Sequence, residues 1–213
     1  DAAMKRSAIH FDGDDYLSIP ASGDFSFGTG AYTLEAWVYS SGTGDGFGGA
    51  SSYGGIVSAY GSSAPYGPIL EINDSKWKVH VGDDGGGSAE HSDTGVTVVA
   101  DAWHHVAAVR ESTAASKLYF YLNGTKVWTG TDSANYTAAT TPAWIGELEG
   151  SGYNPTGYIY DACITKGVAK DPTATGYRTN PFVTTKLTHP GGDDSGNKNH
   201  FDVVNLGGHD VVG

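Results

Sequence analysis

Short runs of alternating apolar and polar residues recur along the chain, and each run is bounded by Gly, Asp, Asn, Ser or Pro. A period of two places the apolar side chains on one face of an extended strand, so each run predicts a half-buried β-strand. Helical character is confined to a turn expected near 171–177. Strands are predicted at 7–11, 16–19, 32–39, 55–60, 68–72, 76–82, 95–99, 103–110, 117–122, 125–129, 142–147 and 157–165.

One pair of these runs is separated by a specific turn sequence. In KLYFYLNGTKVW, Asn123 and Gly124 lie between two alternating segments. Both residue types accept the positive φ angles of a type I′ turn, whose twist matches that of the strands it joins. The segment therefore predicts a β-hairpin.

The number and spacing of the runs determine the fold class that we expect. A chain of 213 residues is within the range of a single all-β domain, and its 32 glycines and 13 tyrosines suit strands and turns. A dozen strands at this spacing predict an all-β, two-sheet antiparallel β-sandwich of the jelly-roll type. Residues 1–180 are expected to form this domain. Residues 181–213 are expected to be a C-terminal tail that supplies an edge strand or begins a further module.

The chain is acidic, with 24 Asp and Glu residues against 12 Lys and Arg residues and a net charge of -12. Such a charge repels phosphate groups, so neither nucleic acid nor an anionic membrane surface is an expected partner. No run reaches the roughly 18 apolar residues of a membrane span, so membrane insertion is not expected. The single cysteine, Cys163, excludes an internal disulfide.

The adjacent histidines in ADAWHHVAAVRES raise the question of a metal site. Alternation along a strand points His104 and His105 to opposite faces, so one regular strand cannot direct both to the same ion. The chain has no HExxH or CxxC motif and no third histidine at ligand spacing nearby. We predict structural histidines, one facing the core and the other half exposed. Trp37, Trp77 and Trp103 also occupy strand positions and are predicted to be core residues.

Several segments follow one another in the order of a known family. AIHFDGDDYLSIP, YTLEAWVYS, WHHVAAVRES with KLYFYLNGTKV, AWIGELEG and PTGYIYDACI together resemble laminin G-like jelly-roll domains of the concanavalin A-like lectin/glucanase superfamily, over residues 7–170. The resemblance implies a β-sandwich that acts as a binding module more often than as an enzyme. The C-terminal segment DDSGNKNHFDVVNLGGHDVVG is similar to sequences in marine phage structural proteins, which implies a place on a virion.

The resemblance also implies a calcium ion at the rim of the sandwich. Clustered carboxylates and loop carbonyls provide the hard oxygen ligands that calcium prefers. In FDGDDY the candidates are Asp12, Asp14 and Asp15, together with Asp161 on a late strand that the family places close to the first strand. The alternative for FDGDDY is a hairpin turn, in which Asp and Gly are favoured without any metal.

A second acidic stretch, IGELEG, resembles the calcium loop of the related pentraxins and makes Glu147 and Glu149 further candidate ligands. These carboxylates would share one face of a strand, as the acid and the nucleophile of a retaining glucanase do. The full Glu-x-Asp-x-Glu triplet is absent from this stretch and from LEIND, which offers Glu71, Asn73 and Asp74. Catalysis is therefore the least favoured interpretation.

Tyrosine-rich loops form the candidate ligand-binding surface. Aromatic rings stack on sugar rings while neighbouring polar groups fix the hydroxyl groups, and loops of Tyr, Ser, Gly and Asn suit adaptable recognition. The alternative for each tyrosine is that it anchors its loop to the body of the domain. The candidates are Phe47, Tyr53, Tyr60, Tyr66 and Tyr153.

Taken together, the residues and the resemblance favour a non-catalytic, calcium-associated module that binds a glycan or another host-surface ligand. Such a module would be extracellular, displayed on a virion or a cell exterior. The alternative is a structural phage component that decorates a capsid or tail through contacts with other virion or surface proteins only. A glycoside hydrolase is the third interpretation.

Overall fold

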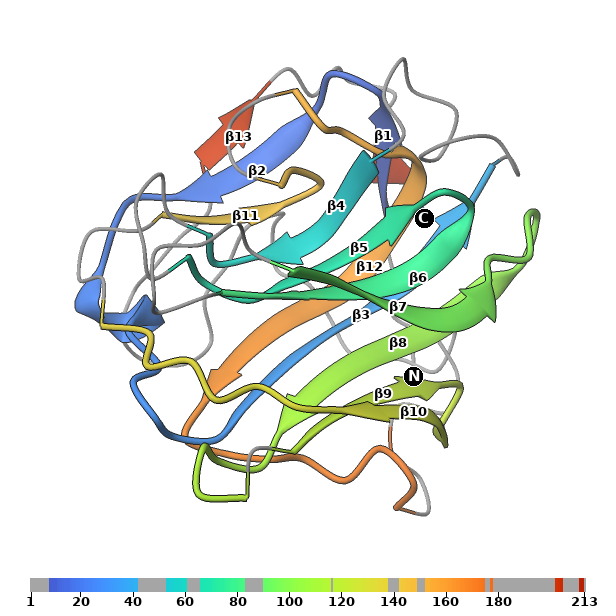
Figure 1. The fold of residues 1–213 in the computed structure, drawn as a ribbon. Coiled ribbons are helices and arrows are strands. Elements are labelled where there is room, and N and C mark those ends of the chain that lie inside the picture. Colours follow the sequence, from blue (N-terminus) through green and yellow to red (C-terminus); the bar gives the residue numbers. More distant parts are fainter. Residues whose placement is uncertain are drawn as a thin grey trace, which may run out of the picture.

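The computed structural model describes residues 8–41, 53–60, 66–82, 90–115, 117–137, 142–148, 152–174, 177, 202–204 and 211–212. These residues form fourteen β-strands and one short 3-10 helix, Gly23–Phe25. The strands make two seven-stranded sheets that pack face to face (Figure 1). The predicted all-β, two-sheet antiparallel sandwich is thereby confirmed. Within the described part of the chain, no helix has the length and apolar character to cross a membrane.

The first sheet, here called sheet A, contains the hairpin predicted from the Asn-Gly dipeptide. Asn123 and Gly124 adopt φ angles of 50° and 77°, the left-handed values that the turn requires. All the strand pairs of sheet A are antiparallel. From edge to edge, sheet A consists of β10 (Thr125–Gly130), β9 (Leu118–Leu122), β8 (Trp103–Arg110), β3 (Tyr32–Ser40), β12 (Thr156–Lys166), β1 (Ala8–Asp12) and β14 (Val211–Val212).

The second sheet, sheet B, is also antiparallel and receives the strand that follows β1 in the chain. The turn between β1 and β2 therefore crosses from one sheet to the other at the rim of the sandwich. β13 and β14, both within the predicted tail, lie at one edge of each sheet. From edge to edge, sheet B consists of β13 (Asp202–Val204), β2 (Tyr16–Ile19), β11 (Ala143–Ile145), β4 (Tyr53–Ser58), β5 (Ile69–Asn73), β6 (Lys76–Val81) and β7 (Glu90–Thr97).

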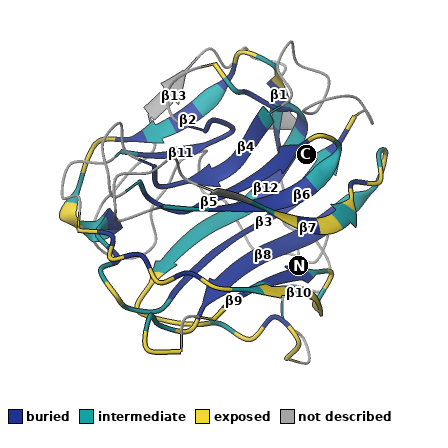
Figure 2. Ribbon diagram, in the orientation of Figure 1, coloured by how far each residue is buried: buried dark blue, intermediate teal, exposed yellow. Residues whose placement is uncertain are grey.

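Alternate residues of the strands fill the space between the sheets. Leu34 and Val38 of β3 are fully buried in the main core, which Leu70 and Ile72 of β5 share from sheet B. Trp77 of β6 is also fully buried there, as its strand position predicts. Burial of each side chain of this kind contributes about 1.5–3 kcal/mol. The strands β3, β5 and β8 are consequently buried along most of their length, whereas β12 is largely of intermediate burial and β7 and β10 carry exposed residues (Figure 2).

A buried charged network closes one end of the core. Arg110 is fully buried, and its guanidinium lies 3.3 Å from the Asp132 carboxylate. The rings of Tyr32 and Tyr136 flank the guanidinium at 4.7 and 4.9 Å, and their hydroxyls donate to Asp132 at 2.7 and 3.1 Å. Because a buried charge must be paired and hydrogen-bonded, these contacts fix the segment around Asp132 to the end of sheet A.

One predicted strand differs from the structure in its bounds. The strand predicted at 95–99 is observed as β7 at an edge of sheet B, where its polar first half pairs with β6 without an alternating apolar pattern to reveal it. In the segment 171–177, where a turn is expected, the Ala174 N–H donates to the Asp171 carbonyl oxygen at 3.2 Å and the Tyr177 N–H donates to the Ala174 carbonyl oxygen at 2.9 Å.

Candidate functional site

One group of aromatic side chains lies on the outer face of sheet B, away from the main core. On β11, Ala143 and Ile145 point into the main core, so Trp144 between them points outward. Trp144 packs with Tyr60 in a separate cluster. We call the following group the tyrosine face: Tyr16, Tyr53, Tyr60, Tyr66, Trp144 and Tyr153.

A stack of rings forms the centre of the tyrosine face. Tyr60 and Tyr66 lie 4.9 Å apart between ring centroids with an angle of 9° between their planes, and His80 stacks on Tyr60 at 5.4 Å and 23°. Tyr60 is only 8% exposed, whereas Tyr66 and Tyr153 are half-buried. The stack therefore presents Tyr66 outward and rests on buried Tyr60.

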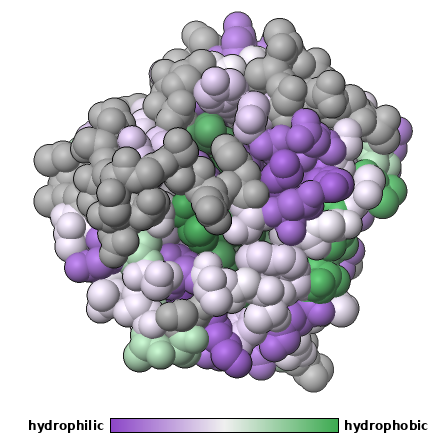
Figure 3. Space-filling view, in the orientation of Figure 1, coloured by the Kyte–Doolittle hydropathy of each residue, from purple (hydrophilic) through white to green (hydrophobic). Residues whose placement is uncertain are grey.

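Charged side chains lie beside this aromatic group. Figure 3 shows apolar side chains near the centre of the face drawn and hydrophilic side chains next to them, over β6 and β7. Lys76 of β6 donates to Asp93 of β7 at 2.7 Å. This hydrogen bond raises the pKa of Lys76 and lowers the pKa of Asp93. The pair places charges of both signs on the outer face of sheet B, four residues along β6 from His80.

Close backbone contacts position the segments that carry the tyrosines. A Cβ atom on Gly67 would lie 1.6 Å from the Ala59 carbonyl oxygen, and one on Gly82 would lie 1.7 Å from the Tyr66 carbonyl oxygen. A Cβ atom on Gly55 would lie 2.3 Å from the carbonyl group of Glu147. Only glycine permits these approaches, so the three glycines determine where the tyrosines can lie.

Glu147 organises the loop that carries Tyr153. Its carboxylate is 1% exposed and accepts hydrogen bonds from the backbone N–H groups of Leu148 (2.7 Å), Gly152 (3.2 Å) and Tyr153 (3.3 Å). The Asn154 amide also donates to it at 3.0 Å. Both carboxylate oxygens are therefore engaged within the loop.

Asn154 connects this loop to the acidic turn between β1 and β2. Its side-chain nitrogen lies 3.0 Å from the Asp15 carbonyl oxygen and 2.9 Å from the Gly146 carbonyl oxygen, in addition to its contact with Glu147. The residue is buried, at 5% exposure. The acidic turn and the tyrosine face are thus parts of one connected region.

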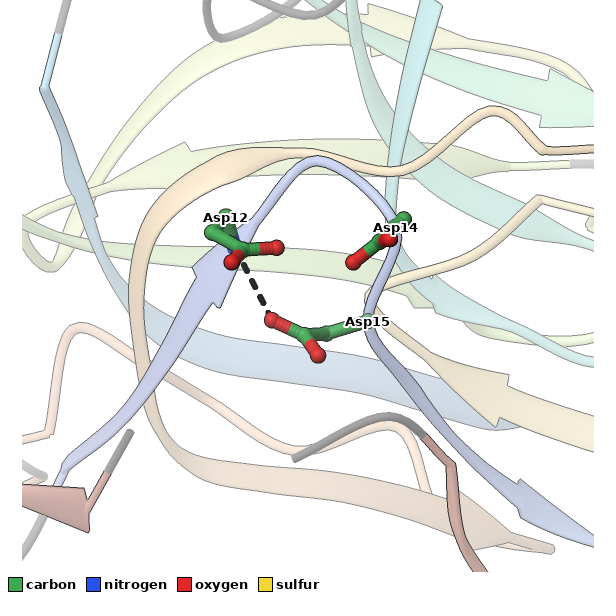
Figure 4. A group of neighbouring side chains, drawn as sticks. All are labelled: Asp12, Asp14 and Asp15. Carbon is green, nitrogen blue, oxygen red and sulfur yellow. Dashed lines mark hydrogen bonds between the residues drawn. The ribbon is translucent and has the colours of Figure 1, made fainter. Parts of the chain in front are cut away.

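The acidic turn itself brings three carboxylates together. Ligand oxygens of Asp12, Asp14 and Asp15 lie within 4.8 Å of one another, and the side chains point into the space enclosed by the turn (Figure 4). Asp15 is 1% exposed and accepts from the Asp12 N–H at 3.0 Å, whereas Asp12 and Asp14 are exposed. A hydrogen bond with Asp14, aided by Asp15 and the charge of His10, holds the pKa of Asp12 below its usual range.

The remaining predicted site residues lie elsewhere or outside the described residues. Asp12 pairs with Thr156 in β12, and Asp161 lies five residues further along that strand, about 16 Å away at the rise of an extended chain. Asp161 occupies an irregularity in β12 with a φ of 52° and does not join the acidic turn. Phe47 and Glu149 lie outside the described residues.

Neither histidine of the Trp-His-His segment is half exposed. His104 and His105 point to opposite faces of β8, as predicted, but they are only 9% and 2% exposed. His104 lies against Trp77 in the core, and its Nε2 contacts the Val99 carbonyl oxygen at 3.1 Å. His105 lies on the outer face of sheet A, where the Tyr177 ring packs at 5.9 Å. The predicted half-exposed histidine is wrong because the segment after β12 covers this face.

The other two tryptophans lie on the outer face of sheet A. Trp37 is buried as predicted, at 6% exposure, but in a second cluster with Ala8 and Tyr160, separate from the main core. Trp103 differs from its predicted core position, because it is half-buried at the start of β8 and packs against this second cluster. Strand position alone did not distinguish the inner face from the outer one.

Several residues of the candidate site were not identified from the sequence. Tyr16 and Trp144 alternate with residues of the main core, and this alternation was the signal that could have placed them on the outer face. Asn154 gave no such signal, because its contact with Asp15 spans 139 residues of chain. His80 is placed on the tyrosine face by its register opposite Ile69.

The two antiparallel, face-to-face sheets place the chain in the class of jelly-roll sandwiches. Within this class, the chain belongs to the concanavalin A-like lectin/glucanases superfamily, because a laminin G-type family model of that description matches residues 11–172. The family that the sequence segments resemble is therefore confirmed.

Solved structures of similar fold share little sequence with this chain. A proposed carbohydrate-binding protein from Bacteroides ovatus is 18% identical with a TM-score of 0.56, and the match covers 83% of this chain and 46% of that one. A heptameric SAP-like pentraxin from Limulus polyphemus is 13% identical with a TM-score of 0.60, covering 98% and 94%. Domains LG4-5 of the mouse laminin alpha1 chain are 13% identical with a TM-score of 0.54, covering 79% and 43%.

At these identities the similarity describes the fold alone. This chain spans less than half the length of the Bacteroides and laminin structures but nearly all of the pentraxin. No curated protein matches the chain.

Proposed function

We propose that this chain is a non-catalytic carbohydrate-binding module that holds its ligand on the tyrosine face. The observation that carries the proposal is the convergence of Tyr53, Tyr60, Tyr66 and Tyr153 into one cluster on the outer face of sheet B. These residues come from three separate segments of the sequence. Each was predicted as a ligand-binding residue because it lies in a loop rich in Tyr, Ser, Gly and Asn.

The chemistry of the cluster suits a sugar. Half-buried Tyr66 and Tyr153 offer ring faces for the apolar side of a pyranose, and phenol hydroxyls can exchange hydrogen bonds with its hydroxyl groups. Support from buried Tyr60 and Trp144 holds these rings in place before a ligand arrives, which reduces the entropy lost on binding. The Bacteroides structure is described as carbohydrate-binding, and we propose the same class of ligand for this chain.

The carboxylates near the tyrosine face are held in contacts within the protein. Glu147 is saturated by three backbone N–H groups and Asn154, so its oxygens are committed to the loop. Glu71 of β5 is fully buried between Gly55 and Lys78 in the register of sheet B. A retaining glycosidase needs two carboxyl groups that both reach the scissile bond. We therefore propose a binding role without hydrolysis.

The test is a glycan array followed by calorimetric titration of the best ligand with the full chain. Replacement of the half-buried ring of the stack, Tyr66→Ala, is expected to weaken binding about fivefold while the melting temperature changes little, because stacking on one ring is worth about 1 kcal/mol. Tyr119→Ala is the matched control, since Tyr119 is a half-buried tyrosine on β9 of the other sheet. Equal affinities of the two variants would reject the tyrosine face as the binding site.

We also propose that the acidic turn binds calcium. Its donor set fits this ion, because Asp12, Asp14 and Asp15 present clustered carboxylate oxygens and two of the residues are open to solvent for water ligands. Bound calcium would neutralise the three carboxylates and supply a Lewis acid for ligand hydroxyl groups. Asn154 links the turn to the Glu147 loop and would keep both in register with the tyrosine face.

Thermal unfolding with and without calcium tests this part of the proposal. Calcium is expected to raise the melting temperature of the wild-type chain, since an ion that binds only the folded state stabilises it by mass action. Asp14→Asn should abolish this rise. Asp74→Asn, at an exposed aspartate outside the turn, should retain it. A calcium-induced rise that survives Asp14→Asn would place the ion elsewhere.

Display on a virion or cell exterior remains part of the proposal and rests on the sequence resemblance. Immunogold labelling of purified virus particles and of intact cells with an antibody against this chain would test it. Labelling of particles together with failure of all glycan binding would instead favour the structural virion component that acts through protein contacts.

A further inference from the structure

The outer face of sheet A carries a second aromatic group, which crosses four adjacent strands. Tyr158 of β12 lies opposite His10 of β1 and Tyr39 of β3, and Tyr39 lies opposite Trp103 of β8. We call these four side chains the aromatic row. Each is half-buried, so part of every ring faces outward.

The rings of the row contact one another in sequence across the sheet. Ring centroids are 4.8 Å apart for His10 and Tyr158, 5.8 Å for Tyr158 and Tyr39, and 5.6 Å for Tyr39 and Trp103. Four neighbouring strands span about 14 Å at the usual strand spacing. The row is therefore long enough to contact several consecutive sugar rings of a chain.

A buried group and a covered part of the same face lie beside the row. Trp37 and Tyr160, which pair across β3 and β12, are 6% and 5% exposed, and Trp103 and Tyr158 of the row pack against them. Next to this group, His105 and Glu35 lie beneath Tyr177, whose hydroxyl donates to Glu35 at 2.6 Å. The segment after β12 therefore covers the part of the face around His105 and Glu35, whereas the rings of the row are half exposed.

Carboxylates flank the row at both ends. Asp12 follows His10 by two residues at the end of β1, and its carboxylate points into the acidic turn beside that end of the row (Figure 4). At the other side, the Tyr39 hydroxyl lies 3.4 Å from the exposed Asp101 carboxylate. Both ends of the row are therefore acidic. Such a surface accepts hydrogen bonds from hydroxyl groups and repels anionic polymers.

We propose that the aromatic row is a second binding surface, for a single extended chain of a neutral polysaccharide. Aromatic stacking provides the contact, and the exposed Asp101 carboxylate accepts hydrogen bonds from sugar hydroxyls. Neighbouring rings are inclined by 44°, 74° and 57°, so the row is not planar. A flat crystalline polymer surface requires coplanar rings, whereas an isolated chain can twist along the row.

The experiment is affinity electrophoresis of the full chain in gels that contain a soluble neutral polysaccharide, with mixed-linkage β-glucan, xyloglucan, xylan and galactomannan as probes. Alginate gels and sedimentation with crystalline cellulose serve as the anionic and the crystalline comparison. The wild-type chain is expected to be retarded by at least one neutral polysaccharide and to bind alginate and crystalline cellulose less.

Row variants locate the binding surface. Trp103→Ala and His10→Ala are expected to weaken retardation about tenfold and severalfold, respectively, in proportion to the ring area lost. Tyr119→Ala, at a half-buried tyrosine on the same outer face but outside the row, should leave retardation unchanged. His10→Ala, on the edge of the row, tests the proposal even if Trp103→Ala fails to fold.

Three results would overturn the proposal. The first is the absence of retardation in every neutral gel, and the second is undiminished retardation of both row variants. The third is retardation that Tyr66→Ala abolishes while Trp103→Ala retains it, which would assign all binding to the tyrosine face. Conversely, loss through the row variants with normal binding by Tyr66→Ala would support the row and leave the tyrosine face to its own test.

Discussion

The two outer faces of the sandwich both carry aromatic side chains, but the chain positions them by different means. On sheet A, the row from His10 to Trp103 follows directly from the register of four adjacent strands. On sheet B, the tyrosines lie near strand ends and in connecting segments, where backbone crossings at Gly55, Gly67 and Gly82 fix their positions. A strand-built surface depends on pairing that the whole core stabilises. A loop-built surface depends on a few close contacts and should be easier to disrupt.

Gly67→Ala should have the largest effect and should separate the two faces. The added Cβ would lie 1.6 Å from the Ala59 carbonyl oxygen, so the backbone must shift. We expect the free energy of unfolding, measured by urea titration, to fall by about 3 kcal/mol, with loss of ligand binding on the tyrosine face. Contacts within the aromatic row should persist.

Gly23→Ala is the control for this variant, because nothing lies within 4 Å of a Cβ atom added there. Its unfolding free energy should remain within about 0.5 kcal/mol of the wild-type value. If Gly67→Ala were as stable as Gly23→Ala, the backbone crossing would not control the tyrosine face.

The same contrast explains how much of the fold the sequence could predict. The period-two pattern identified twelve strands, and the Asn123-Gly124 turn was recognised because a type I′ turn depends on two adjacent residues. The bounds of β7 were displaced, predicted at 95–99 and observed at Glu90–Thr97, because an edge strand needs no apolar face. The pattern also did not distinguish inner from outer positions on β3 and β8, where Trp37 is buried in a cluster outside the main core.

The candidate site was predictable only in its local parts. The acidic turn brings Asp12, Asp14 and Asp15 together because they are adjacent in sequence. The tyrosines were recognised by composition, but their convergence results from contacts between distant segments. Asp161 was assigned to the acidic turn from the proximity of β1 and β12, and only the register of these strands shows that it lies too far along.

Asn154→Ala should have an intermediate effect and tests the link between the acidic turn and the tyrosine face. The variant removes the donor shared by the carbonyl oxygens of Asp15 and Gly146 and the carboxylate of Glu147, all in a buried region. Buried acceptors left without a donor cost about 2 kcal/mol, so we expect a loss of that size in the unfolding free energy. The stabilisation by calcium should also decrease.

Ser41→Ala is the comparison for Asn154→Ala, because the Ser41 hydroxyl donates to the Thr156 carbonyl oxygen at an exposed position. Water replaces an exposed hydrogen bond, so this variant should change stability by less than about 0.5 kcal/mol. Equal losses in the two variants would argue against a special role for Asn154.

Acidification should have the smallest effect and should act on both faces alike. The pKa of Asp93 is lowered mainly by its hydrogen bond with Lys76, and the pKa of Asp12 is lowered mainly by its hydrogen bond with Asp14. A carboxyl group whose pKa is lower in the folded chain contributes stability above its unfolded pKa, about 3.9, and loses it as the pH falls through the folded value.

Melting temperatures measured between pH 7 and pH 2.5 test this sign. The melting-temperature deficit of Asp93→Asn relative to the wild-type chain should be constant above pH 5 and should shrink as the pH falls below about 4 and through the lowered pKa of folded Asp93, where the wild-type carboxylate becomes protonated. Added salt should reduce the deficit at pH 7, because Lys76 and Asp93 are exposed to solvent. A deficit that persisted unchanged at pH 2.5 would mean that Asp93 stabilises the sheet B edge through its backbone contact with Gly95 or through packing, and not through its charge.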